Sequence, residues 1–409
     1  MAALLERVGT RLVEVLTFND KFYLNNGVTW AMVRAKGDGG TRPQPQYLLV
    51  IPVITLLILV SRFAFERFVA LRVGRYLEVN ERRPTPPEPN AILEKAFKKT
   101  PKPNDKLVTG LAKSTNKSVR YIERWFRRAR SVSLPSNMRK FQEGSWRFLA
   151  YLTLLTVGCF VVPNKDYWLD TRKNWLLYPN RSMTEDIFWY YMVELSFYVS
   201  LTISQFLDIR RKDFWQMFIH HIVTIFLISF SYCVNFFAIG ATIMFVHDMA
   251  DPWLELAKIL GYVRRDGEGR SKKQYIGEGL FLLFMAVFYY SRLYLYPLHC
   301  LQSTIFEKLE ILGPVWPMYI VFNALLITLL VLHCFWSIQI LRVVKESIIA
   351  GKVKGDVRSC DEDSTGEEEP NSGTKPVEAV LNSAPGGRNG KSPTAGSASN
   401  GHSRSNQRR

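Results

Sequence analysis

The segment RKDFWQMFIHHIVT, residues 211–224, places two adjacent histidines, His220 and His221, inside an apolar stretch that begins with basic residues. At about 1.5 Å of helical rise per residue, the histidines lie about 12 Å in from the basic end. Ionisable side chains are rare at that depth in a membrane helix, and where they occur they mark functional sites. The segment therefore predicts a membrane helix with a functional site inside it.

The next apolar stretch carries HDMAD, residues 247–251. Asp248 and Asp251 are three positions apart, so one helix would place both on the same face, with His247 next to Asp251. Counting back from the end of the stretch near Gly261 puts the two carboxylates about 15–20 Å deep. The two stretches are expected to form a tight helical hairpin in which the histidines and the aspartates meet.

Seven stretches approach the length of about 20 apolar residues that a bilayer requires. Because Lys and Arg stay on the cytoplasmic side, seven spans place every basic cluster on one side, with the N-terminus in the lumen and the C-terminus in the cytoplasm. The chain is therefore predicted to be an all-α integral membrane protein with about seven transmembrane helices. The stretches are residues 46–66, 146–164, 186–207, 214–232, 235–260, 275–297 and 315–341.

The net charge of +17 fits a nucleic acid, a membrane surface or acidic small molecules as a partner. Most basic residues lie beside apolar stretches, which favours the membrane. The five cysteines show no CxxC spacing, so neither a disulfide scaffold nor a cysteine metal site is predicted. The first apolar run starts near Tyr47 and is followed by Arg62 rather than a small-residue cleavage site, so residues 46–66 are expected to stay as the first span after a lumenal segment, residues 1–45.

The polar centre contains more ionisable groups than one Asp–His pair locking two helices together would need. A histidine whose second ring nitrogen is hydrogen-bonded to a carboxylate takes up a proton readily near neutral pH. Such a set supports acyl transfer, with histidine either as the general base or as the nucleophile that carries the acyl group. The sequence leaves both roles open.

A metal site is the first alternative, since His and Asp also bind zinc and iron. Membrane di-iron enzymes need repeated histidine boxes with more histidines than the six of this chain. Of the remaining histidines, His333 is expected to be a packed polar residue of the last span. No metal is predicted.

The stretch from 211 to 262 resembles the Lag1 motif of ceramide synthases. Three further segments resemble the same TLC-type membrane domain, so the resemblance covers residues 139–345: FQEGSWRFLAY (141–151), YYMVELSFYVSLTISQFLDIRRKDF (190–214) and ILGPVWPMYIVFNALLITLLVLHCFWS (311–337). The resemblance implies N-acylation of a sphingoid base by a fatty acyl-CoA in the endoplasmic reticulum membrane. It makes His220, His221, Asp248 and Asp251 the catalytic residues, requires no cofactor because acyl-CoA is a substrate, and leaves a homo- or hetero-dimer open.

Coenzyme A is a polyanion that Arg210, Arg211 and Lys212, together with a second basic cluster at residues 264–273, would attract to the cytoplasmic side, although the same cations also serve membrane orientation. In the resembled family, the loop before the last span, here Glu307–Pro314, tunes the acyl-chain length. The alternative function is a non-catalytic TLC-type protein that binds lipid or assists membrane biogenesis.

Residues 76–135 form a predicted cytoplasmic segment with helices over 91–99, 104–113 and 117–130. The last helix resembles the recognition helix of a homeodomain and would place Trp125 and Phe126 in a small core. Arg128 stands where homeodomains carry the asparagine that reads adenine, and the basic arm is short. A structural or membrane-surface role is therefore expected instead of sequence-specific DNA binding.

Residues 350–409 are rich in Gly, Ser and Asn and predict a disordered cytoplasmic tail. Within it, Ser364 and Thr365 precede an acidic run and are candidate phosphorylation sites. Asn180 begins an Asn-Arg-Ser sequon in a predicted lumenal loop and is a candidate glycosylation site.

Overall fold

The computed structural model describes residues 20–34, 42–79, 85–263 and 272–350. Within these ranges the chain is mainly helical and forms no sheet, although isolated bridge residues occur at Met183 and in an antiparallel bridge between Val79 and Val263. The predicted all-α architecture is confirmed. The predictions for Ser364 and Thr365 lie outside the described residues.

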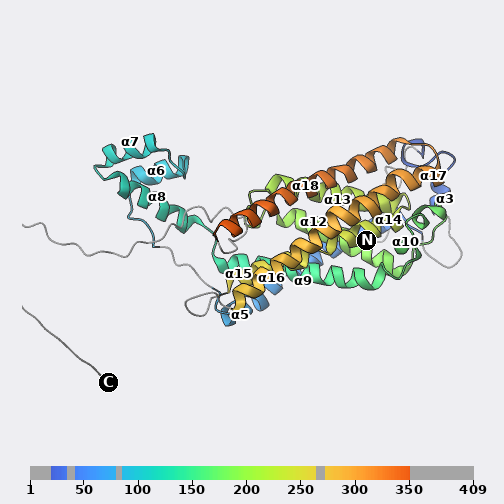
Figure 1. Cartoon of the computed structure of the whole chain (residues 1–409), viewed down its shortest axis with the longest axis horizontal. Helices are drawn as coiled ribbons and strands as arrows, with labels where there is room; N and C mark the ends of the chain where they lie inside the picture. Colours follow the sequence, from blue (N-terminus) through green and yellow to red (C-terminus); the bar gives the residue numbers. More distant parts are fainter. Residues whose placement is uncertain (1–19, 35–41, 80–84, 264–271, 351–409) are drawn as a thin grey trace, which may run out of the picture. The chain divides into compact units, whose positions relative to one another are not determined.

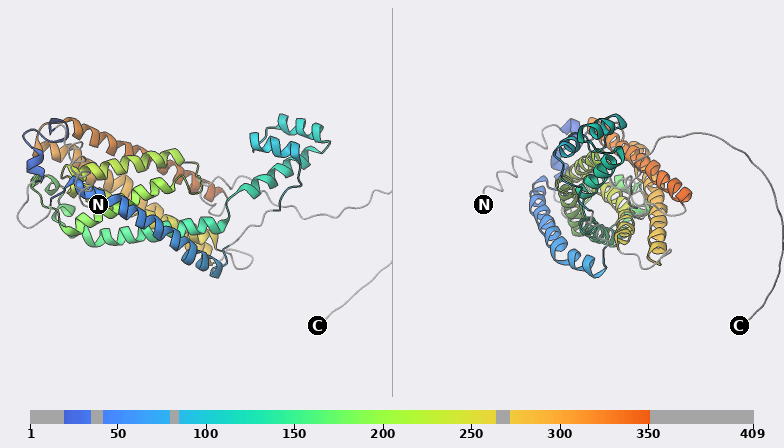
Figure 2. Two further views of the ribbon diagram at one scale, coloured as in Figure 1. Left: turned by 180° about the vertical axis from the view of Figure 1, so that it is seen from behind. Right: turned by 90° about the vertical axis from the view of Figure 1, so that its left-hand side faces the viewer.

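Long helices that pack along one another form the membrane bundle (Figure 1). The first long helix is continuous through α4, η2 and α5 and runs along the outside of the bundle (Figure 2). In chain order the bundle contains α4 (Ile51–Ala64), η2 (Phe65–Ala70), α5 (Leu71–Tyr76), α9 (Asn137–Val161), α12 (Glu185–Ser204), α13 (Phe214–Cys233), α14 (Phe237–Asp248), α15 (Asp251–Tyr262), α16 (Lys272–Phe288), η3 (Tyr289–Leu301), η4 (Ser303–Glu307), α17 (Lys308–Leu312) and α18 (Pro317–Ala350). Short helices in the connections are α2 (Asp20–Tyr23), α3 (Trp30–Arg34), η1 (Pro45–Val50), α10 (Asp166–Leu169) and α11 (Lys173–Leu176).

Five helical stretches in the described part of the chain are long and apolar enough to cross a membrane. The two predicted spans that fall short are α12 and the pair α14–α15. Helix α12 carries Glu185, Asp186 and Glu194, which lower its hydropathy, while α14 and α15 have 12 residues each. The membrane class is thus confirmed, and the number seven stays a prediction. The five stretches are Pro45–Tyr76, Val119–Val161, Phe214–Cys233, Tyr275–Leu312 and Pro317–Ile349.

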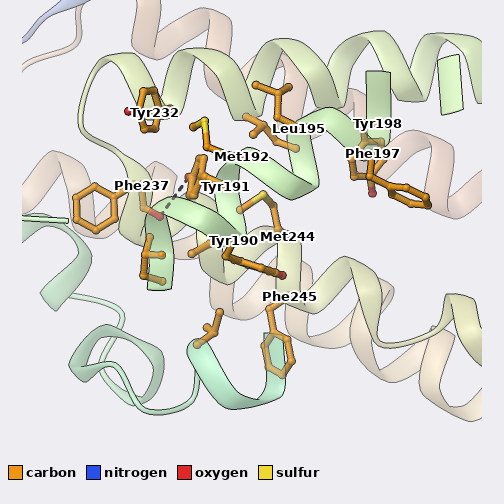
Figure 3. Packing of buried hydrophobic residues seen from close by; sticks show 14 of the residues in the cluster. Tyr190, Tyr191, Met192, Leu195, Phe197, Tyr198, Tyr232, Phe237, Met244 and Phe245 are labelled. Carbon is orange, nitrogen blue, oxygen red and sulfur yellow. Dashed lines mark hydrogen bonds between the residues drawn. The ribbon is translucent and has the colours of Figure 1, made fainter. Parts of the chain in front are cut away.

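Helix α12 is the central helix of the bundle and contacts α4, α9, α13 and α14. Its buried aromatic side chains pack against α13 and α14 (Figure 3), where the Tyr191 hydroxyl donates to the Phe237 carbonyl at 3.2 Å. Gly240 permits this contact, because a Cβ there would lie 1.8 Å from the Tyr191 hydroxyl oxygen. A small residue therefore sets the close approach of α12 and α14.

The turn between α13 and α14 is short and is closed by Asn235. Its backbone has φ +64°, a left-handed conformation that asparagine tolerates better than most residues. Its amide nitrogen donates to the carbonyls of Pro179 and Arg181 at 2.7 and 3.1 Å. The predicted tight hairpin is confirmed, and we call this end of the bundle the hairpin end.

The predicted single helix over 235–260 was wrong. Helix α14 ends at Asp248, and α15 begins at Asp251 with Pro252 in its first turn, where proline is favoured. The two aspartates therefore flank a break in the helix instead of sharing the face of one continuous helix.

The opposite end of the bundle, the basic end, is held by ion pairs that are largely shielded from the surface. Arg147 of α9 lies 3.3 Å from Asp208 and 3.6 Å from Glu255, and Arg62 also pairs with Asp208. Glu255 of α15 additionally lies 3.1 Å from Lys258. These contacts fix α15 to its neighbours on one side of the break, while the hairpin turn fixes α14 on the other.

Three helices in the segment between α5 and α9 form a unit with its own core: α6 (Ala91–Lys99), α7 (Asp105–Thr115) and α8 (Val119–Ser133). Each begins with a side-chain cap, supplied by Asn90, Asn104 and Ser118. Trp125 and Phe126 are buried in the core as predicted. The three predicted helices are confirmed, with ends that differ from the prediction by at most three residues.

Candidate active site

The break between α14 and α15 is stabilised by Arg292 of η3, a buried residue. Its Nη2 donates to the carbonyl oxygen of His247 and lies 3.3 Å from Oδ2 of Asp251, while its Nη1 donates to Nε2 of His333 at 3.3 Å. A helix that stops inside a membrane leaves carbonyl groups without partners, at a cost of several kcal/mol each. Arg292 satisfies one of them and balances a carboxylate at the same time.

Asp248, the last residue of α14, faces α12. The hydroxyl of Tyr190 donates to its Oδ2 at 3.0 Å. Glu194 lies one turn farther along α12, and its carboxyl group interacts with that of Asp248. The exposed fractions of Glu194 and Asp248 are 0% and 2%, so both carboxyl groups are enclosed by protein.

The two histidines of α13 are buried and differ in their contacts. Nδ1 of His221 lies 3.1 Å from the Gln205 side-chain oxygen, so Nδ1 carries the proton and Nε2 is the basic nitrogen. The His220 ring packs against Trp336 with centroids 5.4 Å apart, and its Nδ1 has no hydrogen-bond partner among the described residues. Hydrogen bonds therefore restrain the side chain of His220 less than that of His221.

Tyr198 of α12 lies near both the histidines and the carboxyl groups. Its ring centroid is 6.2 Å from those of both His220 and His221. It also lies within electrostatic range of Asp248, Glu194 and Asp251. The structure therefore brings the four predicted residues into one region around a tyrosine.

The hydrogen-bond partners differ from those expected. The sequence predicted a carboxylate on a histidine ring nitrogen, whereas His221 pairs with the amide of Gln205, and Asp248 accepts from the hydroxyl of Tyr190. The physical reason is the helix break, which turns Asp248 toward α12 instead of toward α13.

An apolar cavity adjoins this region. It holds about 690 Å³ of space outside the protein atoms, including space open to the outside. His247 and Tyr198 line it beside the break, and Trp175, Phe236 and Thr304 line it near the hairpin end. The other lining residues come from α13, α14 and α18: Thr224, Leu227, Ile228, Ser231, Ile239, Gly240, Ile243, Met244, Tyr319, Phe322, Asn323, Leu326 and Leu329.

Comparison with known proteins places this arrangement in a family. Residues 140–342 match the TLC domain family. Ceramide synthase 5 of Mus musculus is 39% identical over 343 residues, which cover 84% of this chain and 81% of that protein. Ceramide synthase 4 of Homo sapiens is 36% identical over 371 residues, 90% of this chain and 91% of that protein. The chain belongs to the ceramide synthase family. Human ceramide synthase 3 is likewise 36% identical over 347 residues, covering 84% and 87%.

The basic residues predicted to attract coenzyme A lie at the basic end of this ceramide synthase. Arg210 and Lys212 are exposed, whereas the guanidinium of the half-buried Arg211 lies 3.9 Å from Glu255. Most of the other predicted cluster, 264–273, lies outside the described residues. Asn180 of the sequon is exposed, with its Oδ1 3.4 Å from Nη1 of Arg42.

Glu194 and Arg292 of the ceramide synthase were missed by sequence reasoning. Each is an ionisable residue inside a predicted span, which is itself the signal that could have identified them. His333, predicted to be merely packed, accepts a hydrogen bond from Arg292, and its ring lies 5.0 Å from that of His247. No cluster of three or more His, Cys, Asp or Glu side chains in the described ranges is arranged to hold a metal ion.

Proposed function

We propose that this ceramide synthase transfers a fatty acyl group from acyl-CoA to the primary amine of a sphingoid base, giving dihydroceramide or ceramide. The observation that carries the proposal is a buried histidine pair and a set of carboxyl groups beside an apolar cavity. Acyl transfer needs a base or nucleophile, and the two lipid substrates need an apolar environment for their chains. The relatives named ceramide synthase support the same reaction.

His220 is the histidine that we assign to the reacting groups. It shares a face of α13 with Thr224, Leu227 and Ser231, all of which line the cavity, because these positions follow helical spacing. His221 then acts as a positioning residue whose tautomer is set by Gln205. His220 either removes the proton from the attacking amine or carries the acyl group to it.

The cavity suits the acyl chain. Most of the side chains that line it are apolar, as the hydrocarbon of an acyl chain requires. The segment Glu307–Pro314 lies against it through Lys308, whose Nζ is 4.0 Å from the ring centroid of the cavity residue Tyr319. Residues of this segment therefore support the chain-length role expected of it.

Coenzyme A would remain at the basic end, attracted by the exposed Arg210 and Lys212. The positive-inside rule then places this end in the cytoplasm and the hairpin end, with Asn180, in the lumen of the endoplasmic reticulum. Acyl-CoA supplies an activated thioester, so the proposed reaction needs no cofactor.

The proposal is tested by expressing the chain in cells that lack ceramide synthesis and supplying acyl-CoAs of graded length with a sphingoid base. Ceramide is measured by mass spectrometry. His220→Ala is expected to lower the rate by at least about 100-fold, the usual value of a general base. His299→Ala is the matched control, because this histidine binds the Trp168 carbonyl away from the centre at 2.8 Å.

Ceramide formation that survives the combined change His220→Ala and His221→Ala would overturn the catalytic assignment. A folded wild-type chain that binds acyl-CoA and makes no ceramide would instead support the non-catalytic lipid-binding alternative, which the apolar cavity would also serve.

A further inference from the structure

Glu194 is a carboxylic acid placed halfway along α12 with no exposed surface. Neither of its carboxyl oxygens has a hydrogen-bond donor within the described parts of the chain that satisfies normal geometry. A charged carboxylate in that position would cost several kcal/mol without a partner. Its chemical state therefore depends on its immediate neighbours.

Its nearest ionisable neighbour is Asp248. Tyr190 and Glu194 are four residues apart and so share one face of α12, and the Tyr190 hydroxyl donates to Asp248 at 3.0 Å. The Glu194 carboxyl interacts with the same aspartate. Over the described ranges, neither carboxyl group forms an ion pair with Lys, Arg or His.

The surrounding groups supply little compensating charge. Arg292 contacts Asp251 and the His247 carbonyl and acts on Asp248 only at longer range. Two carboxylates side by side in an enclosed site cannot both ionise without a large repulsive cost, and sharing one proton removes it. The titratable groups that act on Glu194 or Asp248 are Tyr190 and Tyr198 of α12, Cys159 of α9, Asp251 of α15 and Arg292 of η3, and the rings of His220 and His221 lie behind Tyr198 with centroids 6.2 Å from its own.

We propose that Glu194 and Asp248 share one proton, with Glu194 donating its hydrogen bond to Asp248. Glu194 is then a positioning residue that acts through Asp248 and keeps one negative charge on the pair. One negative charge at bilayer depth matches a membrane-borne substrate with a primary ammonium group, an assignment that rests on the proposed function.

If the pair shares one proton, Glu194→Gln and Glu194→Leu should differ strongly in activity. Glutamine reproduces the protonated acid, since its amide donates to Asp248 and leaves the charge unchanged, so E194Q is expected to retain most of kcat/KM for the sphingoid base. Leucine removes the donor, so E194L is expected to lose at least about tenfold, the value of one hydrogen bond to a charged group. The matched control is Glu185→Gln, the same change at an exposed position of α12.

The pH profile separates this role from a packing role. In the wild type, loss of the shared proton at high pH makes the pair doubly negative and ends activity. Glutamine cannot ionise, so E194Q is expected to stay active to higher pH than wild type with the same substrate, while E185Q keeps the wild-type profile. A loss in E194Q as large as in E194L, or an unchanged profile in E194Q, overturns the proposal.

Infrared spectroscopy of the full-length chain in lipid nanodiscs gives a readout that needs no activity. The wild type at neutral pH is expected to show a protonated-carboxyl C=O band that is lost in E194Q and kept in E185Q. Absence of that difference overturns the shared proton. If the band is present but the wild type makes no ceramide, the proposed function fails and the shared proton stands.

Discussion

Nη2 of Arg292 lies 3.3 Å from Oδ2 of Asp251, across the break that separates α14 from α15. The same guanidinium donates to the carbonyl of His247 and to the ring of His333 in α18. One side chain thus holds both halves of the broken helix and a third helix. A flat guanidinium with several fixed donors suits this role, whereas an ammonium does not.

Arg292→Ala is expected to lower the free energy of unfolding by about 3–5 kcal/mol, because it leaves a buried carboxylate without its partner. Arg292→Lys should fall between, since it keeps the charge and loses the fork. Thermal unfolding in detergent measures both. The control is Arg172→Ala, which removes an exposed pair with Glu310 and should cost less than about 1 kcal/mol. Equal stability of the Arg292 and Arg172 variants would refute the assignment.

The basic residues before α13 should separate into two roles. Lys212→Gln removes an exposed cation, so it is expected to raise KM for acyl-CoA without lowering Tm, and the difference from wild type should shrink as salt screens the charge. Arg211→Gln removes a partner of the buried Glu255 and is expected to lower Tm. Steady-state kinetics over a salt series and thermal melts test the pair. The distinction fails if both changes act on Tm alike.

Gly240→Ala is expected to destabilise the bundle, because its Cβ would lie 1.8 Å from the Tyr191 hydroxyl oxygen and force α12 and α14 apart. The cost should reach about 1–3 kcal/mol, as for overpacked cores. Gly279→Ala is the control, since no atom lies within 4 Å of its added Cβ. Chemical unfolding of both variants, compared with wild type, decides the matter, and a Gly240→Ala chain as stable as the control contradicts this packing.

Thr304→Phe fills the cavity near the hairpin end, so the preferred acyl chain is expected to become shorter while activity on short chains remains. Competition between acyl-CoAs of different lengths measures the shift. Phe306, two residues away and 62% exposed, gives the control Phe306→Leu, which should leave the preference unchanged. An unchanged preference in Thr304→Phe would mean that the acyl chain lies elsewhere.

Much of the fold could be predicted, because hydropathy and local signals act over short distances. Residues close together in sequence determine the hairpin at Asn235 and the three helices capped by Asn90, Asn104 and Ser118. The break at Asp248 could not be predicted in the same way. It depends on Arg292, which is more than forty positions away in sequence and reaches the break only in the folded bundle.

The candidate site was predicted in part for the same reason. Ionisable residues in apolar stretches can be recognised from the sequence alone, and this pattern identified His220, His221, Asp248 and Asp251. Their hydrogen-bond partners could not be predicted, because these depend on tertiary contacts. Nothing in the sequence marks Gln205 and Tyr190, yet in the structure they bind His221 and Asp248.

The broken helix has a mechanical consequence. Helix α14 is tied through Asn235 to one end of the bundle, and α15 is tied through Glu255 to the other. A change in bilayer thickness that moves the two ends of the bundle relative to each other would therefore change the distance between Asp248 and Asp251. We expect the activity to depend on the thickness of the surrounding lipid. The membrane would then regulate the reaction that alters its own composition.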